Sequence, residues 1–467
     1  MITTRHPAEI LALHPDGPPK GEITLISAWV RTCDDRGQLM KARLPLGVLM
    51  LAAAAVRAGF AVAVRDLQLI QAPSASKDTV TLVKEVLEDP APILGISCMS
   101  DIMPAVLLAL TELKCKQPWL RVILGGPGPG PSAQELLADW PAVDIVAVGE
   151  GEVTLVAILE AISGQGPLEK VDGICFREKE QIICTTRRLR QQDLDIFLPL
   201  PIEGIPLEQY SALFPIITAR GCSYRCAFCS AAGLWGERIT RHSTSAIMQQ
   251  IATIASKGYR RFAFVDDTFV LQRRRVQEMC ETMLRAGFGL SWHCNGRIDL
   301  QDEALLGIMS EAGCGSIFYG VESGSRRVLE RIGKGFTPEQ VYQVVERSLE
   351  YMQTTLSFIW GFPFETWQDF QETRRMYESL NRHTRLHYQT HLLTPYPGVP
   401  IYQEYAHLLH FDPDIHSHVR QDNLPLSKEE IRAIRQYPRL FPSFYHFESP
   451  DFERKAQQIA ADTATLP

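Results

Sequence analysis

The chain has 467 residues, of which 45% are apolar and 22% charged, and its formal net charge is −7. A chain of this length can bury the cores of two or three domains. The acidic balance and the lack of a basic stripe argue against a nucleic-acid partner, because phosphate binding needs clustered Lys and Arg.

No apolar run reaches the roughly 18 residues of a membrane span. The longest, Leu44 to Val56, ends at Arg57 and predicts a buried helix. The first ten residues lack the charged and apolar regions of a secretory signal. Eleven cysteines in such a chain predict free thiols rather than disulfides, and a cytoplasmic protein.

The first domain is expected over residues 1–165. After a polar lead-in of about 20 residues, expected to be irregular, strands alternate with helices, which predicts a doubly wound parallel sheet. The expected strands are Ile23–Trp29, Ala61–Val64, Ile93–Ser97, Arg121–Leu124 and Ile145–Val148. The expected helices are Pro45–Ala58, Thr79–Leu87, Ala105–Lys116 and 153–163.

The loops after these strands carry the candidate ligand contacts of the first domain. In doubly wound sheets, ligands bind beyond the carboxyl ends of the strands. Asp66, Ser97 and the turn Gly125-Gly126-Pro127 stand there. The turn lacks the G-x-G-x-x-G order, and its prolines remove amide donors, so it is not a dinucleotide fingerprint.

Residues 166–212 are expected to connect two domains. Ile174 to Arg188 predict a small hairpin, and a Pro-rich stretch follows, which is typical of an interdomain linker.

Three cysteines follow the linker in the spacing C-x3-C-x2-C: Cys222, Cys226 and Cys229. Thiolates are the usual ligands of iron–sulfur clusters, and the usual full set is four. Three would leave one iron of a [4Fe–4S] cluster open to a ligand that is not protein. A structural zinc site or three unrelated buried cysteines are the alternatives, but zinc needs a fourth ligand, and the nearest His is His242.

A second run of alternating strands and helices surrounds this motif over residues 213–404 and predicts a partial (β/α)6 barrel of the TIM type. Thr337, Pro338 and Gln340 predict a capped helix start, and Ser427 with Glu430 starts a helix in a C-terminal extension over residues 405–467. The expected strands are Ile216–Ala219, Arg261–Val265, Leu290–Cys294, Ser316–Tyr319, Ser357–Trp360 and His387–Leu393.

The cysteine spacing, with Phe228 just before the third Cys, resembles the signature of the radical S-adenosylmethionine (SAM) enzymes. The resemblance implies that SAM chelates the open iron and that an electron from the cluster cleaves it to a 5′-deoxyadenosyl radical. It covers residues 216–399.

The resemblance also implies SAM contacts at the carboxyl ends of the barrel strands. Asp266 and Asp267 could instead cap a helix, and Arg297 could form a structural ion pair. Gly361 and the residues of the last loop could be plain turns. The set that the resemblance assigns to SAM is Phe228, Asp266, Asp267, Arg297, Glu322, Ser323, Gly361, Pro395 and Tyr396.

The first domain resembles the Rossmann-like cobalamin-binding domain that precedes many radical SAM barrels. No His stands between His14 and His242, so the domain supplies no axial imidazole, and it could have kept its shape without the corrin. The residues assigned to cobalamin by the resemblance are Pro45, Leu46, Gly47, Asp66, Ser97, Gly125, Gly126, Pro127, Gly149 and Glu150.

Other candidates have plainer interpretations. Lys334 recurs in the family after the fourth strand, but we expect an exposed side chain. The spacing of His383, His387 and His391 could line a pocket or a metal row, and more simply gives satisfied polar groups. Cys294 and Cys314 stand near strand ends and could donate hydrogen, as a Cys does in radical epimerases.

These resemblances imply a cobalamin-dependent radical SAM enzyme that methylates a carbon of a natural-product or peptide precursor. The alternatives are a cyclase, a rearrangement or epimerisation enzyme, and a non-catalytic cobalamin or redox sensor. A methylthiotransferase is disfavoured, because the N-terminal half lacks a second set of three cluster cysteines. The expected partners are a small-molecule or peptide substrate and a reductant such as flavodoxin or ferredoxin.

Overall fold

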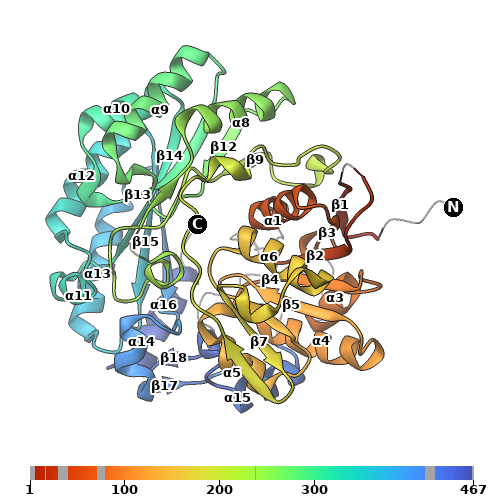
Figure 1. Ribbon diagram of the computed structural model, residues 1–467. Coiled ribbons are helices and arrows are strands. Elements are labelled where there is room, and N and C mark those ends of the chain that lie inside the picture. Colours follow the sequence, from red (N-terminus) through yellow and green to blue (C-terminus); the bar gives the residue numbers. More distant parts are fainter. Residues whose placement is uncertain are drawn as a thin grey trace. The chain divides into compact units, whose positions relative to one another are not determined.

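A computed structural model describes residues 6–15, 17–29, 40–70, 79–236, 238–415 and 426–464 (Figure 1). The chain divides into two compact units. The first comprises residues 1–192, 196–212 and 419–442, and the second comprises 193–195, 213–418 and 443–467. Among the described residues, no helix is long and apolar enough to cross a membrane.

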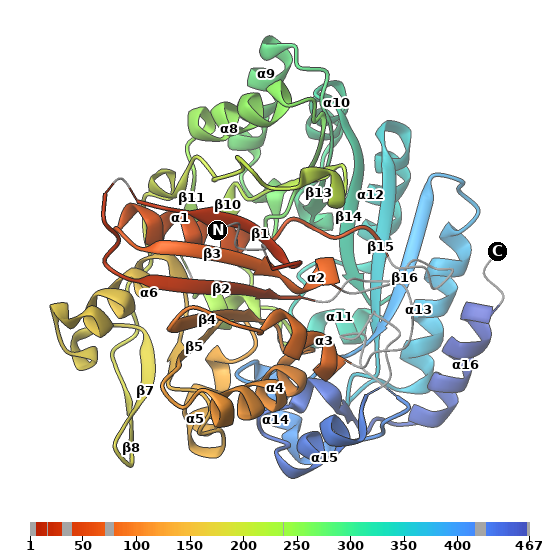
Figure 2. The same cartoon turned by 90° about the vertical axis from the view of Figure 1, so that its right-hand side faces the viewer.

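The first unit contains an eight-stranded sheet in the order β1-β3-β2-β4-β5-β6-β7-β8. The five central strands are parallel, which confirms the predicted doubly wound sheet. Helices cover it in pairs, α1 against α6 and α3 against α4 (Figure 2). The elements are β1 Glu9–Leu13, β2 Glu22–Ala28, α1 Leu46–Arg57, β3 Ala61–Asp66, α2 Leu67–Ile70, α3 Thr79–Val86, β4 Ile93–Cys98, α4 Met103–Lys116, β5 Arg121–Gly125, α5 Ala133–Asp139, β6 Ile145–Ala147, α6 Gly151–Glu160, β7 Ile174–Glu178, β8 Gln181–Cys184 and α15 Lys428–Gln436.

Three antiparallel strands extend this sheet beyond the sequence-based expectation. The lead-in that we expected to be irregular contains β1, which pairs with β3. The predicted hairpin forms as β7 and β8, and β7 pairs with β6, so the hairpin belongs to the sheet. Both additions depend on pairing with distant strands, which a local pattern does not reveal.

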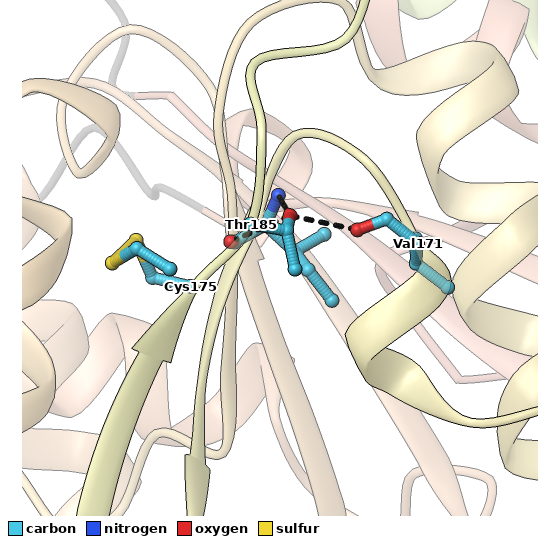
Figure 3. The surroundings of a disulfide bond; sticks show 5 residues. Val171, Cys175 and Thr185 are labelled. Carbon is cyan, nitrogen blue, oxygen red and sulfur yellow. Dashed lines mark hydrogen bonds between the residues drawn. A yellow bond between two sulfur atoms is a disulfide. The ribbon is translucent and has the colours of Figure 1, made fainter.

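The hairpin also corrects the expectation of free thiols. Cys175 and Cys184 face each other in the register of β7 and β8, their Cα atoms are 4.1 Å apart, and they form a disulfide (Figure 3). The prediction was wrong for this pair because it counted cysteines and took no account of cross-strand register. The hydroxyl of Thr185 closes the hairpin by donating to the carbonyl oxygen of Val171 over 2.7 Å.

The second unit confirms the predicted partial barrel. Its six-stranded sheet has the order β9-β12-β13-β14-β15-β16, and every neighbouring pair is parallel. Helices α8, α9, α10, α12 and α13 line its outer side (Figure 1). The main elements are β9 Leu213–Ile216, β10 Ala219–Arg220, α7 Ala231–Trp235, β11 Thr240–Arg241, α8 Thr244–Ser256, β12 Arg261–Phe264, α9 Arg273–Ala286, β13 Ser291–Gly296, α10 Glu303–Glu311, β14 Cys314–Glu322, α11 Arg326–Arg331, α12 Pro338–Tyr351, β15 Gln353–Trp360, α13 Trp367–Leu380, β16 Leu386–Leu392, α14 Pro400–Tyr405, β17 Leu409–His410, β18 His446–Phe447 and α16 Phe452–Ala464.

Helix capping explains two of the predicted helix starts. Thr337 and Gln340 form a reciprocal capping box at the start of α12, with Pro338 in the first turn. Ser427 and Glu430 do the same at α15. Helix α15 packs on the first unit, where Tyr437 contacts Trp140 edge to face at 4.8 Å between ring centroids.

Candidate active site

The three cysteines of the motif lie on one loop between β10 and α7. Backbone hydrogen bonds fix this loop from two sides. The N–H of Ala227 donates to the carbonyl of Ile332 over 2.9 Å, and the N–H of Ile401 donates to the carbonyl of Ala227 over 3.0 Å. Cys226 is buried, whereas Cys222 and Cys229 are half-buried. The cysteine loop is therefore held in place by hydrogen bonds to two other segments of the barrel.

The three thiols lie close enough for the charge on one to change the pKa of another. Burial raises the pKa of Cys229 to about 11, and the charges of Cys226, Asp267 and Cys222 act in the same direction. The backbone N–H of Ala231 acts in the opposite direction by donating to the Cys229 sulfur. Three thiolates here would repel one another, so a cationic centre between them is needed to keep them deprotonated.

The three cysteines of the loop supply fewer ligands than a structural zinc site needs. Within the described part of the chain, no group of three or more Cys, His, Asp or Glu side chains converges closely enough to hold a single metal ion. A zinc ion requires such convergence on one centre. In a [4Fe–4S] cluster each thiolate binds a different iron, so the three sulfurs stand farther apart.

Arg297 lies beside Cys226 and is buried. Its Nη1 is 3.8 Å from the Cys226 sulfur, its Nε donates to Asp299 over 2.8 Å, and its Nη2 donates to the carbonyl of Lys334. The guanidinium stacks on the ring of Tyr224, 3.4 Å from the centroid. The Arg297 cation thus offsets negative charge at the cysteine loop. It also forms a structural ion pair, with Asp299.

Asp266 and Asp267 hold the backbone that leads into the cysteine loop. Both oxygens of buried Asp266 accept hydrogen bonds from Thr218, through its N–H at 2.6 Å and its hydroxyl. Asp267 accepts from the N–H of Gly221 over 2.9 Å. Burial raises the pKa of Asp266 to about 6, although the Thr218 hydrogen bonds lower it. Neither residue caps a helix, since α9 begins after Gln272.

Glu322 and Lys334 form a buried pair that we did not predict. Lys334 Nζ donates to Glu322 Oε1 over 3.1 Å, and both residues are less than one-tenth exposed. The expectation of an exposed Lys334 was wrong, because the chain after α11 turns back under β14 to reach Glu322. Glu322 itself has φ +70°, an unfavourable conformation for a residue other than glycine, and such strain clusters at functional sites.

Ser323 points away from the cysteine loop. Its hydroxyl hydrogen-bonds with the hydroxyl of Thr373 at 3.0 Å and accepts from the N–H of Ser325 at 3.1 Å. Ser323 is fully buried, so its side chain anchors the loop after β14 on α13.

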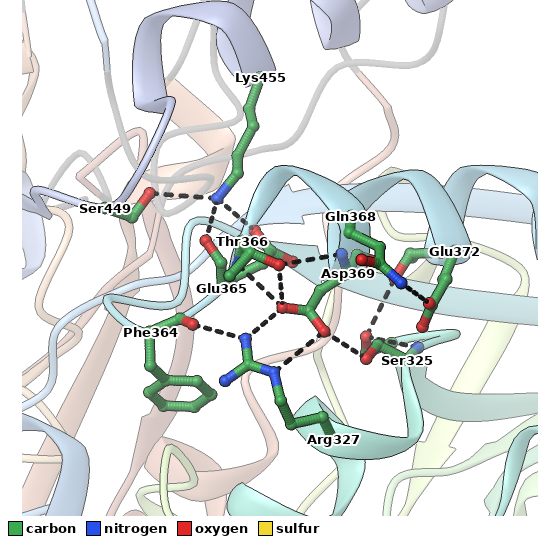
Figure 4. Close-up of polar contacts among 12 residues, drawn as sticks. Ser325, Arg327, Phe364, Glu365, Thr366, Gln368, Asp369, Glu372, Ser449 and Lys455 are labelled. Carbon is green, nitrogen blue, oxygen red and sulfur yellow. Dashed lines mark hydrogen bonds and ion pairs between the residues drawn. The ribbon is translucent and has the colours of Figure 1, made fainter.

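Gly361 follows β15 with φ +83°, and a Cβ there would lie 2.6 Å from a Leu392 methyl group. Its N–H donates to Oε2 of Glu365 over 3.0 Å. Glu365 pairs with Lys455 of α16 at 3.2 Å, and both side chains are fully buried (Figure 4). Burial raises the pKa of Glu365 to about 7, although the Lys455 charge lowers it. The C-terminal helix therefore fixes this loop, which sequence reasoning missed because 90 residues separate the two partners.

Phe228 and Tyr396 pack on one apolar cluster that includes Val328, Ile332 and Phe362. Phe228 meets Phe362 edge to face at 6.1 Å between ring centroids. Pro395 precedes Tyr396 in the loop after β16. Tyr396, a candidate adenine contact, and Phe228 of the cysteine loop thus pack on the same apolar cluster.

The remaining candidates of the barrel do not form a site together. His383 pairs with Glu346 at 3.3 Å, whereas His387 is exposed on β16. Cys294 and Cys314 are buried neighbours within the barrel wall, and burial raises the pKa of Cys294 far above its ordinary value. Their burial gives a substrate no access to either thiol.

In the first unit, the carboxylate of Asp66 accepts hydrogen bonds from other residues of the same unit. It is fully buried, accepts from the hydroxyl of Tyr210 over 2.9 Å, and accepts from the N–H of Gln68 over 3.0 Å. Glu150 is similarly engaged: it pairs with Arg190 at 3.4 Å and accepts from the N–H of Gln191 over 3.0 Å. These carboxylates tie the linker to the domain.

The backbone shapes the carboxyl edge of this sheet. Gly126 has φ +98°, and a Cβ there would lie 2.8 Å from the carbonyl oxygen of Cys98. The loop that follows Gly125 at the end of β5, with Gly126 and Pro127, therefore packs directly on Ser97 and Cys98 at the end of β4. Such close approach needs a glycine.

Open space remains beside the neighbouring loops of the same edge. A Cβ at Gly47 or at Gly149 would meet no atom of the described residues within 4 Å, and Gly149 has φ +91°. Pro45 and Leu46 begin α1 directly before Gly47. Open backbone at the carboxyl ends of parallel strands fits the binding of a large, flat cofactor.

Comparisons with known proteins agree with this geometry. Residues 216–377 match the model of the radical SAM superfamily, and residues 44–159 match that of the B12-binding domain. The first match contains the cysteine loop and the barrel strands β12 to β15, and the second contains β3 to β6 of the doubly wound sheet.

Two relatives that are similar to this chain carry different names, one a methyltransferase and the other a cyclase. An uncharacterised methyltransferase of Pyrococcus horikoshii is 31% identical over 293 residues, 61% of this chain and 62% of that protein. An anaerobic magnesium-protoporphyrin IX monomethyl ester cyclase of Synechocystis is 27% identical over 300 residues, 62% of this chain and 59% of that protein. The chain thus matches about six-tenths of the length of these relatives.

The fold is shared with a solved structure across almost the whole chain. The radical SAM methyltransferase TsrM from Kitasatospora setae, with cobalamin and a [4Fe–4S] cluster bound, superimposes with a TM-score of 0.73 at 17% identity, covering 96% of this chain and 91% of that one. The chain thus contains a domain of the radical SAM superfamily that follows a B12-binding domain.

Proposed function

We propose that this chain is a cobalamin-dependent radical SAM methyltransferase that methylates a carbon of a small-molecule or peptide substrate. The observation that carries the proposal is the order of the two domains, with an open three-cysteine loop in the barrel. The names of the Pyrococcus horikoshii relative and of TsrM support methyl transfer.

When bound, the cluster supplies the electron that cleaves SAM, and cobalamin carries a methyl group to the substrate. Cys222, Cys226 and Cys229 would hold the cluster, and Arg297 would balance its negative charge. Asp266 and Asp267 position the loop through Thr218 and Gly221 rather than through a ligand. The strained Glu322, oriented by Lys334, is the side chain we assign to the SAM amino group.

Phe228, Gly361, Pro395 and Tyr396 would border the adenine of SAM, because their loops lie on the same apolar cluster as the cysteine loop. In the first unit we assign the corrin to the backbone of the loops at Gly47, Gly126 and Gly149. The residues that match the B12-binding model, 44–159, contain no His to serve as an axial ligand.

The products of SAM distinguish this function from its alternatives. Protein reconstituted anaerobically with iron, sulfide and cobalamin would be incubated with SAM and dithionite. A methyltransferase of this kind releases both 5′-deoxyadenosine and S-adenosylhomocysteine. A cyclase, which the Synechocystis relative suggests, releases 5′-deoxyadenosine alone, and a sensor releases neither. In the cell, we expect reduced flavodoxin or ferredoxin to replace dithionite.

A further inference from the structure

A basic hollow lies where helices α8 and α9 begin. Its volume is about 800 Å³, and its wall includes Arg241, His242, Ser243, Arg273, Arg274 and Arg275. Helix α8 follows β11, which pairs with β10 directly before the cysteine loop, and α9 follows β12 of the barrel. The N–H of His242 donates to the carbonyl of Thr218 over 3.0 Å, four residues before Cys222.

The positive charge of the hollow is only partly neutralised. Arg273 pairs with Asp302, and Arg275 donates to the hydroxyl of Thr218 over 2.9 Å. Arg241 and Arg274 have no carboxylate partner among the described residues. Besides Asp302, the acidic groups nearby include Glu278, which lines the hollow, and Asp195, which accepts from the N–H of Ser243. Asp266 acts on Arg275, and Asp193 lies beside Arg241 in a β-bridge.

The start of α9 is unfavourable without an anion. Its first turn contains three consecutive Arg and no acidic residue, and no side chain caps it. The amino end of a helix carries partial positive charge and unpaired N–H groups, which attract phosphate groups and repel cations. The first turn of α8 also lacks an acidic residue, although Ser243 caps it.

His242 adds an independent observation. The residue is only 2% exposed, and its Nδ1 is 3.2 Å from Asp195, so this nitrogen donates and Nε2 is left as an acceptor. Nε2 has no hydrogen-bond partner within the described structure. A buried polar atom without a partner is costly, and His242 belongs to the wall of the hollow.

We propose that this hollow binds a phosphoryl group of the substrate, a dianionic group whose oxygens accept hydrogen bonds from Arg241 and Arg274. Two guanidinium groups and two helix starts suit a phosphate or diphosphate better than a single carboxylate. The assignment of this anion to the substrate rests on the proposed function.

The test measures binding of inorganic pyrophosphate to the full-length protein by isothermal titration calorimetry at constant ionic strength, without SAM or reductant. We expect Arg274→Gln to raise the Kd at least fivefold and the Arg241→Gln/Arg274→Gln pair at least tenfold. Arg285→Gln is the matched control, because Arg285 is an exposed residue in the last turn of α9. Its Kd should stay within twofold of the unchanged protein.

Absence of pyrophosphate binding, or equal loss in Arg274→Gln and Arg285→Gln, would overturn the proposal. So would a protein that binds no pyrophosphate but binds flavodoxin more weakly after Arg274→Gln, since the hollow would then serve the electron donor. Circular dichroism checks that the variants fold. Failure of SAM cleavage would count against the proposed function alone, because this binding assay needs no turnover.

Discussion

The two units of this chain prepare their candidate cofactor sites by opposite means. In the barrel, buried charged side chains hold the loops: Asp266 and Arg297 brace the cysteine loop, and Glu365 braces Gly361. In the first unit, the corresponding edge is shaped by glycine backbone, at Gly126 and Gly149. Its carboxylates are used elsewhere.

The difference shows that similar residues need different interpretations in the two units. Asp266 in the barrel and Asp66 in the first unit both stand at strand ends and hold another segment of the chain. Only Asp266 holds the segment that leads into the candidate cluster loop. Polar side chains fix an orientation precisely, whereas open backbone accommodates a large surface. The variants below test whether this contrast holds.

The largest effect on stability should come from Lys455→Met in the barrel. The substitution leaves Glu365 buried without its cation, and breaking a buried pair costs roughly 3–5 kcal/mol. Thermal unfolding should show a marked fall in Tm for this variant and recovery in Lys455→Met/Glu365→Gln. Lys428→Met, an exposed control, should leave Tm unchanged. A Tm equal to that of the unchanged protein in Lys455→Met would show that the brace is dispensable.

Arg297→Gln should lower SAM cleavage about 10- to 100-fold, the range found when a residue behind a metal ligand is removed. The reason is the lost cation at 3.8 Å from the Cys226 sulfur. Release of 5′-deoxyadenosine per cluster, with iron content measured in parallel, checks this. Arg285→Gln serves as the surface control, and unchanged cleavage in Arg297→Gln would contradict the positioning role.

In the first unit, a change to the backbone and a change to a side chain should have different effects: the first on cobalamin retention, the second on stability. Gly126→Ala forces a Cβ within 2.8 Å of the Cys98 carbonyl and should reduce the cobalamin retained after gel filtration severalfold. Asp66→Asn should instead cost roughly 1–3 kcal/mol of stability through its lost hydrogen bonds and leave cobalamin retention unchanged. The reverse result would mean that side chains, not backbone, form this site.

A further effect is a pH dependence of stability. The folded pKa of Glu365 is about 7, above its ordinary value of 4.5, so its contribution is complete below pH 4.5 and is lost as the pH rises to 7. The difference in unfolding free energy between the unchanged protein and Glu365→Gln should therefore decrease from pH 5 to pH 7. Urea unfolding at the two pH values measures it, and a difference that grows with pH would refute the assignment.

The sequence alone predicted much of this molecule. Alternation of strands and helices predicted the five central strands and the six barrel strands, and Thr337 and Ser427 predicted their capping boxes. It missed what depends on distant partners: the pairing of β1 with β3, the burial of Lys334 and the contact of Lys455 with Glu365. Local patterns contain no information on such partners.

The most direct test of the account is the electron paramagnetic resonance spectrum of the reduced, anaerobically reconstituted protein with and without SAM. We predict a [4Fe–4S]⁺ signal that changes when SAM is added, because one iron has no protein ligand, and loss of the signal in Cys226→Ala. A zinc-containing protein without iron, or a cluster signal that SAM leaves unchanged, would contradict the central claim that Cys222, Cys226 and Cys229 hold an open cluster.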